Sequence, residues 1–240
     1  MFRVSSAAPD RGPLRPIPRY VTDRADCGRW SRFDVGERPD EGLSGLTIYG
    51  ASRRDTAYAE VLAWKAATSE TFAGLVEEAK FTGTSIVELL KYMYDRGIEI
   101  GGVDLEWRES RYIYTLVTET AVWVDIFHRD SVTALRGLVG SEVGEELLTV
   151  STLTGDDRSL TTHFAETIRR MELKDSYGTI RRADGIRYPS KFGMVADDDY
   201  CWALWISGPE QGASITNLES VDPSDPDVIS AMKITGVYVP

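Results

Sequence analysis

Four short segments of the sequence carry side chains that could act on a ligand. In "CGRW" (residues 27–30) a glycine allows a close turn, and the guanidinium of Arg29 offers planar, bidentate donation to a phosphate or carboxylate. Tyr49 ends the run "LTIY", and Glu60 lies in "YAEVLAW" with apolar neighbours on both sides. A strand end, a turn and about two helical turns would bring this glutamate beside the tyrosine.

The fourth segment, "DGIRYPS" (184–190), presents a serine at the end of an extended run. Pro189 fixes its own φ and biases Tyr188 toward an extended backbone, so Ser190 is displayed at a strand end, where it can orient a ligand. Taken singly, each segment also has an ordinary structural interpretation: a surface or ion-paired arginine, a sheet tyrosine, a solvated helical glutamate and a turn serine. Both interpretations stay open on these residues alone.

The elements that must position these residues are predicted from hydrophobic periodicity. Strands are expected at 2–4, 46–52, 110–118, 121–127, 145–153, 185–190, 200–207 and 233–240, and helices at 52–67, 70–81, 85–97, 131–140 and 156–173. Ser52 or Asp55 is expected to cap the first helix and Gly97 to follow the third. The acidic, proline-containing segment 217–230 is expected to be a loop. Strands at both ends with helices between them predict one α+β domain.

Charge and composition limit the classes of ligand. A formal net charge of −11 disfavours a nucleic-acid partner. Eight arginines nevertheless lie within residues 1–38, so we expect a small anionic ligand near the N-terminal segment. Two isolated cysteines, Cys27 and Cys201, are too few for a zinc site or a disulfide framework, and no metal is expected. Without a signal peptide or an apolar run near ~18 residues, the sequence predicts a cytoplasmic protein that does not contact a membrane.

In their order, the motifs "GRW", "IYGAS", "AEV" and "DGIRYPS" resemble the RES-domain family, named for its Arg, Glu and Ser. Members of this family are toxins of RES–Xre toxin–antitoxin pairs. The resemblance runs from about Arg3 to Ile206, and these short segments are its specific part. It implies an ADP-ribosyltransferase-like fold, a split, mixed β-sheet flanked by helices that grips NAD. It also implies cleavage of NAD+, a substrate rather than a cofactor, at the nicotinamide–ribose bond.

Carried over residue by residue, the resemblance makes Glu60, Arg29 and Tyr49 catalytic, and Arg29, Tyr49, Ser190 and Arg3 substrate-binding. Arg29 would neutralise the pyrophosphate, and Tyr49 would meet the nicotinamide ring and a ribose hydroxyl. Glu60 would stabilise an oxocarbenium-like centre, and Ser190 would orient the nicotinamide amide or the glutamate. No metal is needed, because the leaving group is already positively charged.

The sequence departs from the family pattern at two places. Ser31 stands where family members often have Asn after "GRW", and the stretch between Arg29 and Tyr49 is longer than in the family. Residues 68–151 match none of the motifs, so we expect an insertion of helices and strands there, within a single RES-type domain of residues 1–240.

The resemblance therefore predicts an NAD-degrading toxin that acts by hydrolysis or phosphorolysis and is neutralised by an Xre-type antitoxin. Two alternatives stay open: a mono-ADP-ribosyltransferase that modifies a macromolecule, and a non-catalytic NAD-binding or interaction module. The acceptor is water, inorganic phosphate or a macromolecular side chain. The oligomeric state, a dimer included, is also left open.

Overall fold

A seven-stranded mixed sheet forms the centre of the protein in a computed structural model, which describes residues 1–7, 12–21, 27–98, 101–118, 121–143, 148–174, 178–192, 199–208 and 212–240. The strand order is β4-β7-β8-β2-β1-β3-β9, with β4 and β7 parallel and the other neighbours antiparallel. The strands are β1 (Phe2–Ser6), β2 (Leu46–Ala51), β3 (Arg111–Thr118), β4 (Trp123–Asp125), β7 (Gly185–Pro189), β8 (Tyr200–Ile206) and β9 (Ala213–Ser220). A separate short hairpin pairs β5 (Leu173–Lys174) with β6 (Ile180–Arg181).

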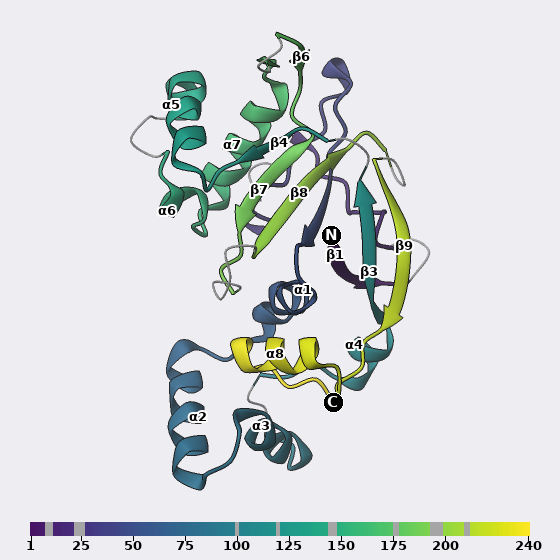
Figure 1. Ribbon diagram of the computed structural model, residues 1–240, viewed down its shortest axis with the longest axis vertical. Helices are drawn as coiled ribbons and strands as arrows, with labels where there is room; N and C mark the ends of the chain where they lie inside the picture. Colours follow the sequence, from purple (N-terminus) through teal and green to yellow (C-terminus); the bar gives the residue numbers. More distant parts are fainter. Residues whose placement is uncertain are drawn as a thin grey trace.

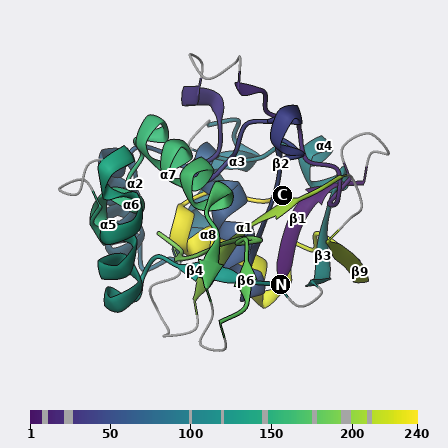
Figure 2. The same ribbon diagram turned by 90° about the horizontal axis from the view of Figure 1, so that it is seen from above.

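Helices flank this sheet. They are α1 (Arg54–Leu62), α2 (Ser69–Thr82), α3 (Ile86–Asp95), α4 (Leu105–Glu109), α5 (Arg129–Val143), α6 (Val150–Leu153), α7 (Arg158–Arg170) and α8 (Pro226–Thr235), with 3-10 turns η2 (Pro39–Glu41) and η3 (Ala63–Lys65). Figure 1 shows α2 and α3 at one end of the molecule, next to α8. In Figure 2, α5 and α6 lie on one side and β3 and β9 on the opposite side. The predicted α+β class, a single domain with a mixed sheet flanked by helices, is confirmed.

The sheet is joined weakly at its middle. β1 and β2 share a single register pair, Phe2↔Ala51, whereas β2 pairs with β8 from Leu46↔Ile206 to Ala51↔Cys201. Beyond that pair the two strands diverge, and Arg3 Nη1 donates to the carbonyl oxygen of Tyr49 at 2.8 Å in place of strand pairing. Figure 1 shows the two halves, with β4, β7 and β8 beyond β2 and β3 and β9 beyond β1. The sheet is therefore open at one position between two well-paired halves.

Each face of the sheet carries its own core. Because successive side chains of a strand point to opposite faces, Ile48 of β2 packs with one cluster and its neighbour Tyr49 with the other. The larger cluster includes fully buried Tyr58 of α1 and Phe164 of α7. The face that carries α1 and α7 therefore has the deeper core, and it is the face toward which Tyr49 points.

Residues 68–151 contribute to the central sheet as well as to its surroundings. Helices α2 and α3 lie beyond α8, but β3 pairs with both β1 and β9, and β4 pairs with β7. This segment therefore supplies an inner strand and an edge strand of the sheet, in addition to outlying helices.

Two predicted strands and one predicted loop are wrong. In the described part of segment 145–153, Thr149 forms a capping box with Thr152 and α6 begins at Val150; residues 145–147 lie outside the described residues. Segment 217–230 completes β9 and begins α8, because Asp225 caps the backbone N–H of Asp227 at 2.9 Å. The last predicted strand, 233–240, is instead the end of α8 followed by an isolated bridge.

The predicted cap of the first helix is also wrong, whereas Gly97 follows α3 with a positive φ of 69° as expected. Arg53 is the N-cap residue of α1 and makes no side-chain cap. Ser52 Oγ instead accepts a hydrogen bond from the backbone N–H of Tyr200, and the Asp55 carboxylate accepts from Arg53 and from the N–H of Thr56. Both side chains fix the start of α1 to its surroundings without capping it.

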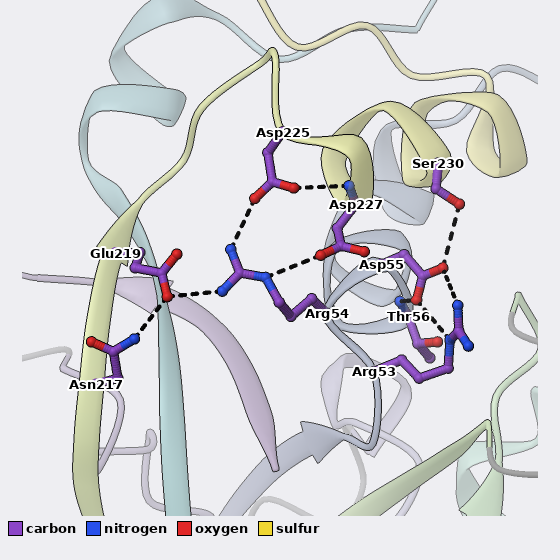
Figure 3. A network of polar contacts seen from close by, with 9 residues as sticks. All are labelled: Arg53, Arg54, Asp55, Thr56, Asn217, Glu219, Asp225, Asp227 and Ser230. Atoms are coloured by element: carbon purple, nitrogen blue, oxygen red, sulfur yellow. Dashed lines mark hydrogen bonds and ion pairs between the residues drawn. The ribbon is translucent and has the colours of Figure 1, made fainter.

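A single guanidinium ties the start of α1 to the C-terminal elements (Figure 3). Arg54 donates to three carboxylates, those of Glu219 at 2.9 Å, Asp225 at 2.8 Å and Asp227 at 3.1 Å. Burial by itself would lower the pKa of Arg54, but the hydrogen bonds to Glu219 and Asp225 outweigh burial and raise it. We call Arg54 and these three carboxylates the Arg54 clamp. It holds α1 against β9 and α8.

Replacing Arg54 with alanine is expected to lower the free energy of unfolding by about 1–3 kcal/mol, because three neighbouring carboxylates lose their shared cation. For a chain of this length, the melting temperature would fall by about 2–10 °C in a calorimetric scan. Lys80→Ala is the control, since it breaks an exposed 2.8 Å pair with Glu77 and should change the free energy by less than about 0.5 kcal/mol. Equal melting temperatures of Arg54→Ala and Lys80→Ala would contradict the role of the clamp.

Candidate active site

A cavity of about 470 Å³ opens where β1 and β2 diverge. One wall is formed by Phe2–Val4 of β1 and Tyr49–Ala51 of β2, and another by Ala57, Glu60 and Val61 of α1 with Trp64 of η3. The loop residues 30–32, Arg158 of α7, Tyr188 of β7 and Cys201 of β8 complete it. Side chains that are far apart in the sequence therefore meet at the open position of the sheet.

Glu60 is fixed by two residues, Ser190 at the end of β7 and Cys201 of β8. Ser190 Oγ donates to Glu60 Oε1 at 2.7 Å, and Cys201 Sγ donates to the same oxygen at 3.6 Å. Ser190 is buried, and its Oγ accepts the backbone N–H of Phe192 at 3.0 Å, which directs its own proton to the carboxylate. Within the described ranges Oε2 of Glu60 has no hydrogen-bond partner. One carboxylate oxygen is thus held in place and the other is available to a ligand.

Tyr49 contributes its ring to the cavity, while its hydroxyl is already engaged. The hydroxyl donates to Asp34 Oδ1 at 2.9 Å and accepts the backbone N–H of Phe33 at 2.9 Å. Burial and the adjacent Asp34 charge raise the pKa of Tyr49 well above its usual value, so the phenol stays neutral. The hydroxyl is therefore a structural anchor. This geometry does not favour the expected contact between the hydroxyl and a ribose.

Asp34 is a positioning residue that the sequence analysis missed. Its buried carboxylate also accepts the backbone N–H of Ser31 at 2.9 Å and Arg19 Nε at 2.9 Å. Trp205 Nε1 donates to the carbonyl oxygen of Phe33 at 3.1 Å and fixes the same loop to β8. These contacts hold residues 30–32 in the wall of the cavity. No motif in the sequence marks Asp34, whose role depends on contacts with distant residues.

Three arginines give the cavity a positive potential. Arg3, Arg32 and Arg158 line it, and Glu60 is the lining carboxylate. Burial lowers the pKa of Arg3 to about 10, an effect that the Asp34 charge opposes, so Arg3 stays cationic at neutral pH. Arg3 Nε and Arg158 Nη1 are buried without hydrogen-bond partners in the described part of the chain. Because unpaired buried donors are costly, this arrangement favours an anionic ligand.

The structure brings together four of the five residues expected from the sequence. Arg3, Tyr49 and Glu60 line the cavity, and Ser190 bonds to Glu60 from behind it. Arg29 is exposed and does not line the cavity, whereas Arg32, three residues further along the same loop, does. Arg3 and Arg32 both line the cavity, which agrees with the expectation of an anionic ligand near the N-terminal arginines. Nothing in the sequence except its residue type marks Arg158 as part of the site.

Comparison of the chain with protein-family models, with curated proteins and with solved structures found no match. Over the described ranges, no three His, Cys, Asp or Glu side chains gather closely enough to hold a metal ion. Nor does any helix in that part of the chain combine the length and apolar character needed to cross a bilayer.

The two cysteines are expected to react at very different rates. Burial, followed by the Glu60 charge, raises the pKa of Cys201 well above its usual value, whereas Cys27 is half-buried. Because the thiolate is the nucleophile, iodoacetamide at pH 8 should label Cys27 at least about tenfold faster than Cys201. Peptide mass spectrometry of a time course measures both rates, and Cys201→Ala identifies the slow site. Faster labelling of Cys201 would contradict the environment described for it.

Proposed function

We propose that the protein is an NAD+-cleaving enzyme of the RES type, with an ADP-ribosyltransferase-like site that breaks the nicotinamide–ribose bond. One observation carries the proposal: a carboxylate, Glu60, held by Ser190 in a cavity whose other charged lining residues are arginines. The ordered motifs of the sequence support the same assignment independently. The position of the cavity, at the open point of a mixed sheet, also suits a fold in which a split sheet grips NAD.

The charges of NAD+ complement those of the cavity. Its diphosphate is anionic and would be attracted to Arg3, Arg32 and Arg158, while its nicotinamide is cationic and would be attracted to Glu60. When the C–N bond breaks, its electron pair leaves with the nicotinamide nitrogen, and positive charge develops on the ribose. A fixed carboxylate beside this centre stabilises the transition state more than the ground state.

The remaining steps follow from the same groups. Water attacks the anomeric carbon and loses a proton, which yields ADP-ribose; phosphate in its place yields an ADP-ribose phosphate ester. Glu60 Oε2 would bind a ribose hydroxyl, and the ring of Tyr49 would contact the nicotinamide. The geometry favours Arg32 over Arg29 as the loop arginine that meets the diphosphate, because Arg32 lines the cavity.

The biological role proposed here is that of a growth-inhibiting toxin controlled by an Xre-type antitoxin. It depends on the resemblance to RES-domain toxins. The formal charge of −11 is compatible with a more basic partner. An antitoxin that covers the cavity would keep NAD+ out.

Glu60→Gln should lower nicotinamide release from NAD+ by at least about 100-fold, because the amide cannot stabilise developing positive charge. Release is measured with purified protein in buffers with and without inorganic phosphate. Glu77→Gln, an identical change on the exposed face of α2, is the control and should retain full turnover. Turnover that survives in Glu60→Gln with an unchanged melting curve would refute the role of Glu60.

The same assay separates the acceptors. Release that requires phosphate indicates a phosphorylase, and release in both buffers indicates a hydrolase or a transferase. Adenine-labelled NAD+ then tests for a mono-ADP-ribosyltransferase, because only that enzyme would transfer label to a macromolecule. Binding of NAD+ without nicotinamide release would instead favour a non-catalytic module.

Ser190→Ala should lower kcat by about 10- to 100-fold with little change in KM, because Glu60 loses the donor that orients it. Ser190→Thr keeps the hydroxyl and should recover part of the rate. Steady-state kinetics of both variants, with melting curves to confirm folding, make the comparison. Unchanged kcat in Ser190→Ala would mean that the hydrogen bond does not position the carboxylate.

A further inference from the structure

Three cations from separate segments converge on one carboxylate oxygen at the edge of the cavity. Asp156 Oδ1 lies 2.6 Å from Lys191 Nζ, 3.6 Å from Arg158 Nη2 and 3.9 Å from Arg32 Nη2. We call Arg32, Arg158 and Lys191 the cation cluster. The hydrogen bond from Lys191, with the nearby arginine charges, lowers the pKa of Asp156. The side chain of Asp156 is 78% exposed, whereas that of Arg32 is only 10% exposed. The carboxylate thus approaches the cluster from the solvent side.

Asp156 neutralises the cation cluster, and accepts hydrogen bonds from it, only in part. Charge-assisted N–H···O bonds are about 2.7–2.9 Å long, and only the bond to Lys191 is that short. Arg32 donates through Nε to the carbonyl oxygen of Gly155 at 3.2 Å, while Arg158 Nη1 is buried without an acceptor among the described residues. Three positive charges also exceed one negative charge. The cluster therefore has both donors and charge left for a larger anion.

A phosphate group suits the donors and the positive charge that Asp156 leaves available in the cation cluster. It carries more oxygens and more negative charge than a carboxylate, and guanidinium groups bind it through two parallel hydrogen bonds. Arg32 also lies 5.7 Å from the ring centroid of Tyr188, which holds the guanidinium plane in position. Arg32 and Arg158 line the cavity that contains Glu60, and Lys191 directly follows Ser190. A phosphate bound here would be next to the proposed reacting centre.

We propose that Arg32, Arg158 and Lys191 form a phosphate-binding subsite, and that Asp156 competes with the bound phosphate for these cations. The identity of the ligand rests on the proposed function. In that reaction a phosphate group is present in two molecules: in NAD+, as its diphosphate, and in inorganic phosphate, as the attacking group. In either case Asp156 acts as an internal competitor that weakens binding. Removing its charge should therefore strengthen binding, which is the reverse of what removing an ordinary ligand contact does.

The test measures binding rather than turnover. Calorimetric titration with ADP-ribose, and separately with inorganic phosphate, is carried out on the full chain and on three variants. Asp156→Asn should bind about 3- to 10-fold more tightly, and Arg158→Gln at least about 10-fold more weakly. Asp130→Asn is the matched control, because it removes a similarly exposed carboxylate that lies 3.9 Å from His128 and away from the cation cluster, and its affinity should be unchanged. Lys191→Gln, a change at a more exposed position, replaces Arg158→Gln if that variant does not fold.

The two probes distinguish the sources. Changes confined to ADP-ribose assign the subsite to the diphosphate, and changes confined to inorganic phosphate assign it to the attacking group. Equal affinities of all variants for both probes would overturn the proposal. If the wild-type protein releases no nicotinamide but these affinity changes persist, the proposed function fails and the subsite stands. If nicotinamide is released and the affinities do not change, the subsite fails alone.

Discussion

The single register pair between β1 and β2 is the constraint on which the site depends. A continuous sheet would hydrogen-bond the two strands along their whole length and leave no room between them. Here the pairing stops after Phe2↔Ala51, and the guanidinium of Arg3 reaches the carbonyl oxygen of Tyr49 instead. A Cβ on Gly50 would lie 2.9 Å from the Met1 sulfur and 3.1 Å from the carbonyl oxygen of Phe2, so this glycine lets the start of β1 lie close to β2. Because the two strands do not pair beyond this point, a cavity forms between them, with the charged side chain of Arg3 in its wall.

The walls of this cavity are held by polar contacts over long sequence separations. Asp34 joins the loop at residues 30–32 to β2, Ser190 joins the end of β7 to α1, and the Arg54 clamp joins α1 to β9 and α8. Each contact fixes an element that carries a charged group of the site. The geometry of the site therefore rests on a few polar contacts as well as on the apolar core beneath it.

The sequence allowed part of this arrangement to be predicted. Tyr49, Glu60 and Ser190 were found because short motifs place them at a strand end, in a helix and after a proline, and these local features survive in the fold. Arg32 and Arg158 were missed, because only tertiary packing decides which arginine of a loop or helix start faces the cavity. The acidic, proline-containing composition of segment 217–230 predicts a loop, whereas residues 217–220 complete an exposed strand and Asp225 and Pro226 are ordinary helix-start residues. The RES-type activity itself stays a prediction.

The Arg54 clamp also determines when, during synthesis of the chain, the site can be complete. Arg54 and Glu219 are 165 residues apart, and the other two carboxylates of the clamp, those of Asp225 and Asp227, come later still. Translation proceeds from the N-terminus, so α1, which carries Glu60, leaves the ribosome long before the carboxylates that hold this helix in place. A nascent chain therefore has the Glu60 side chain but no fixed position for it. Any activity of this cavity would begin only after α8 has been synthesised and docked, which separates the protein's production from its action in time.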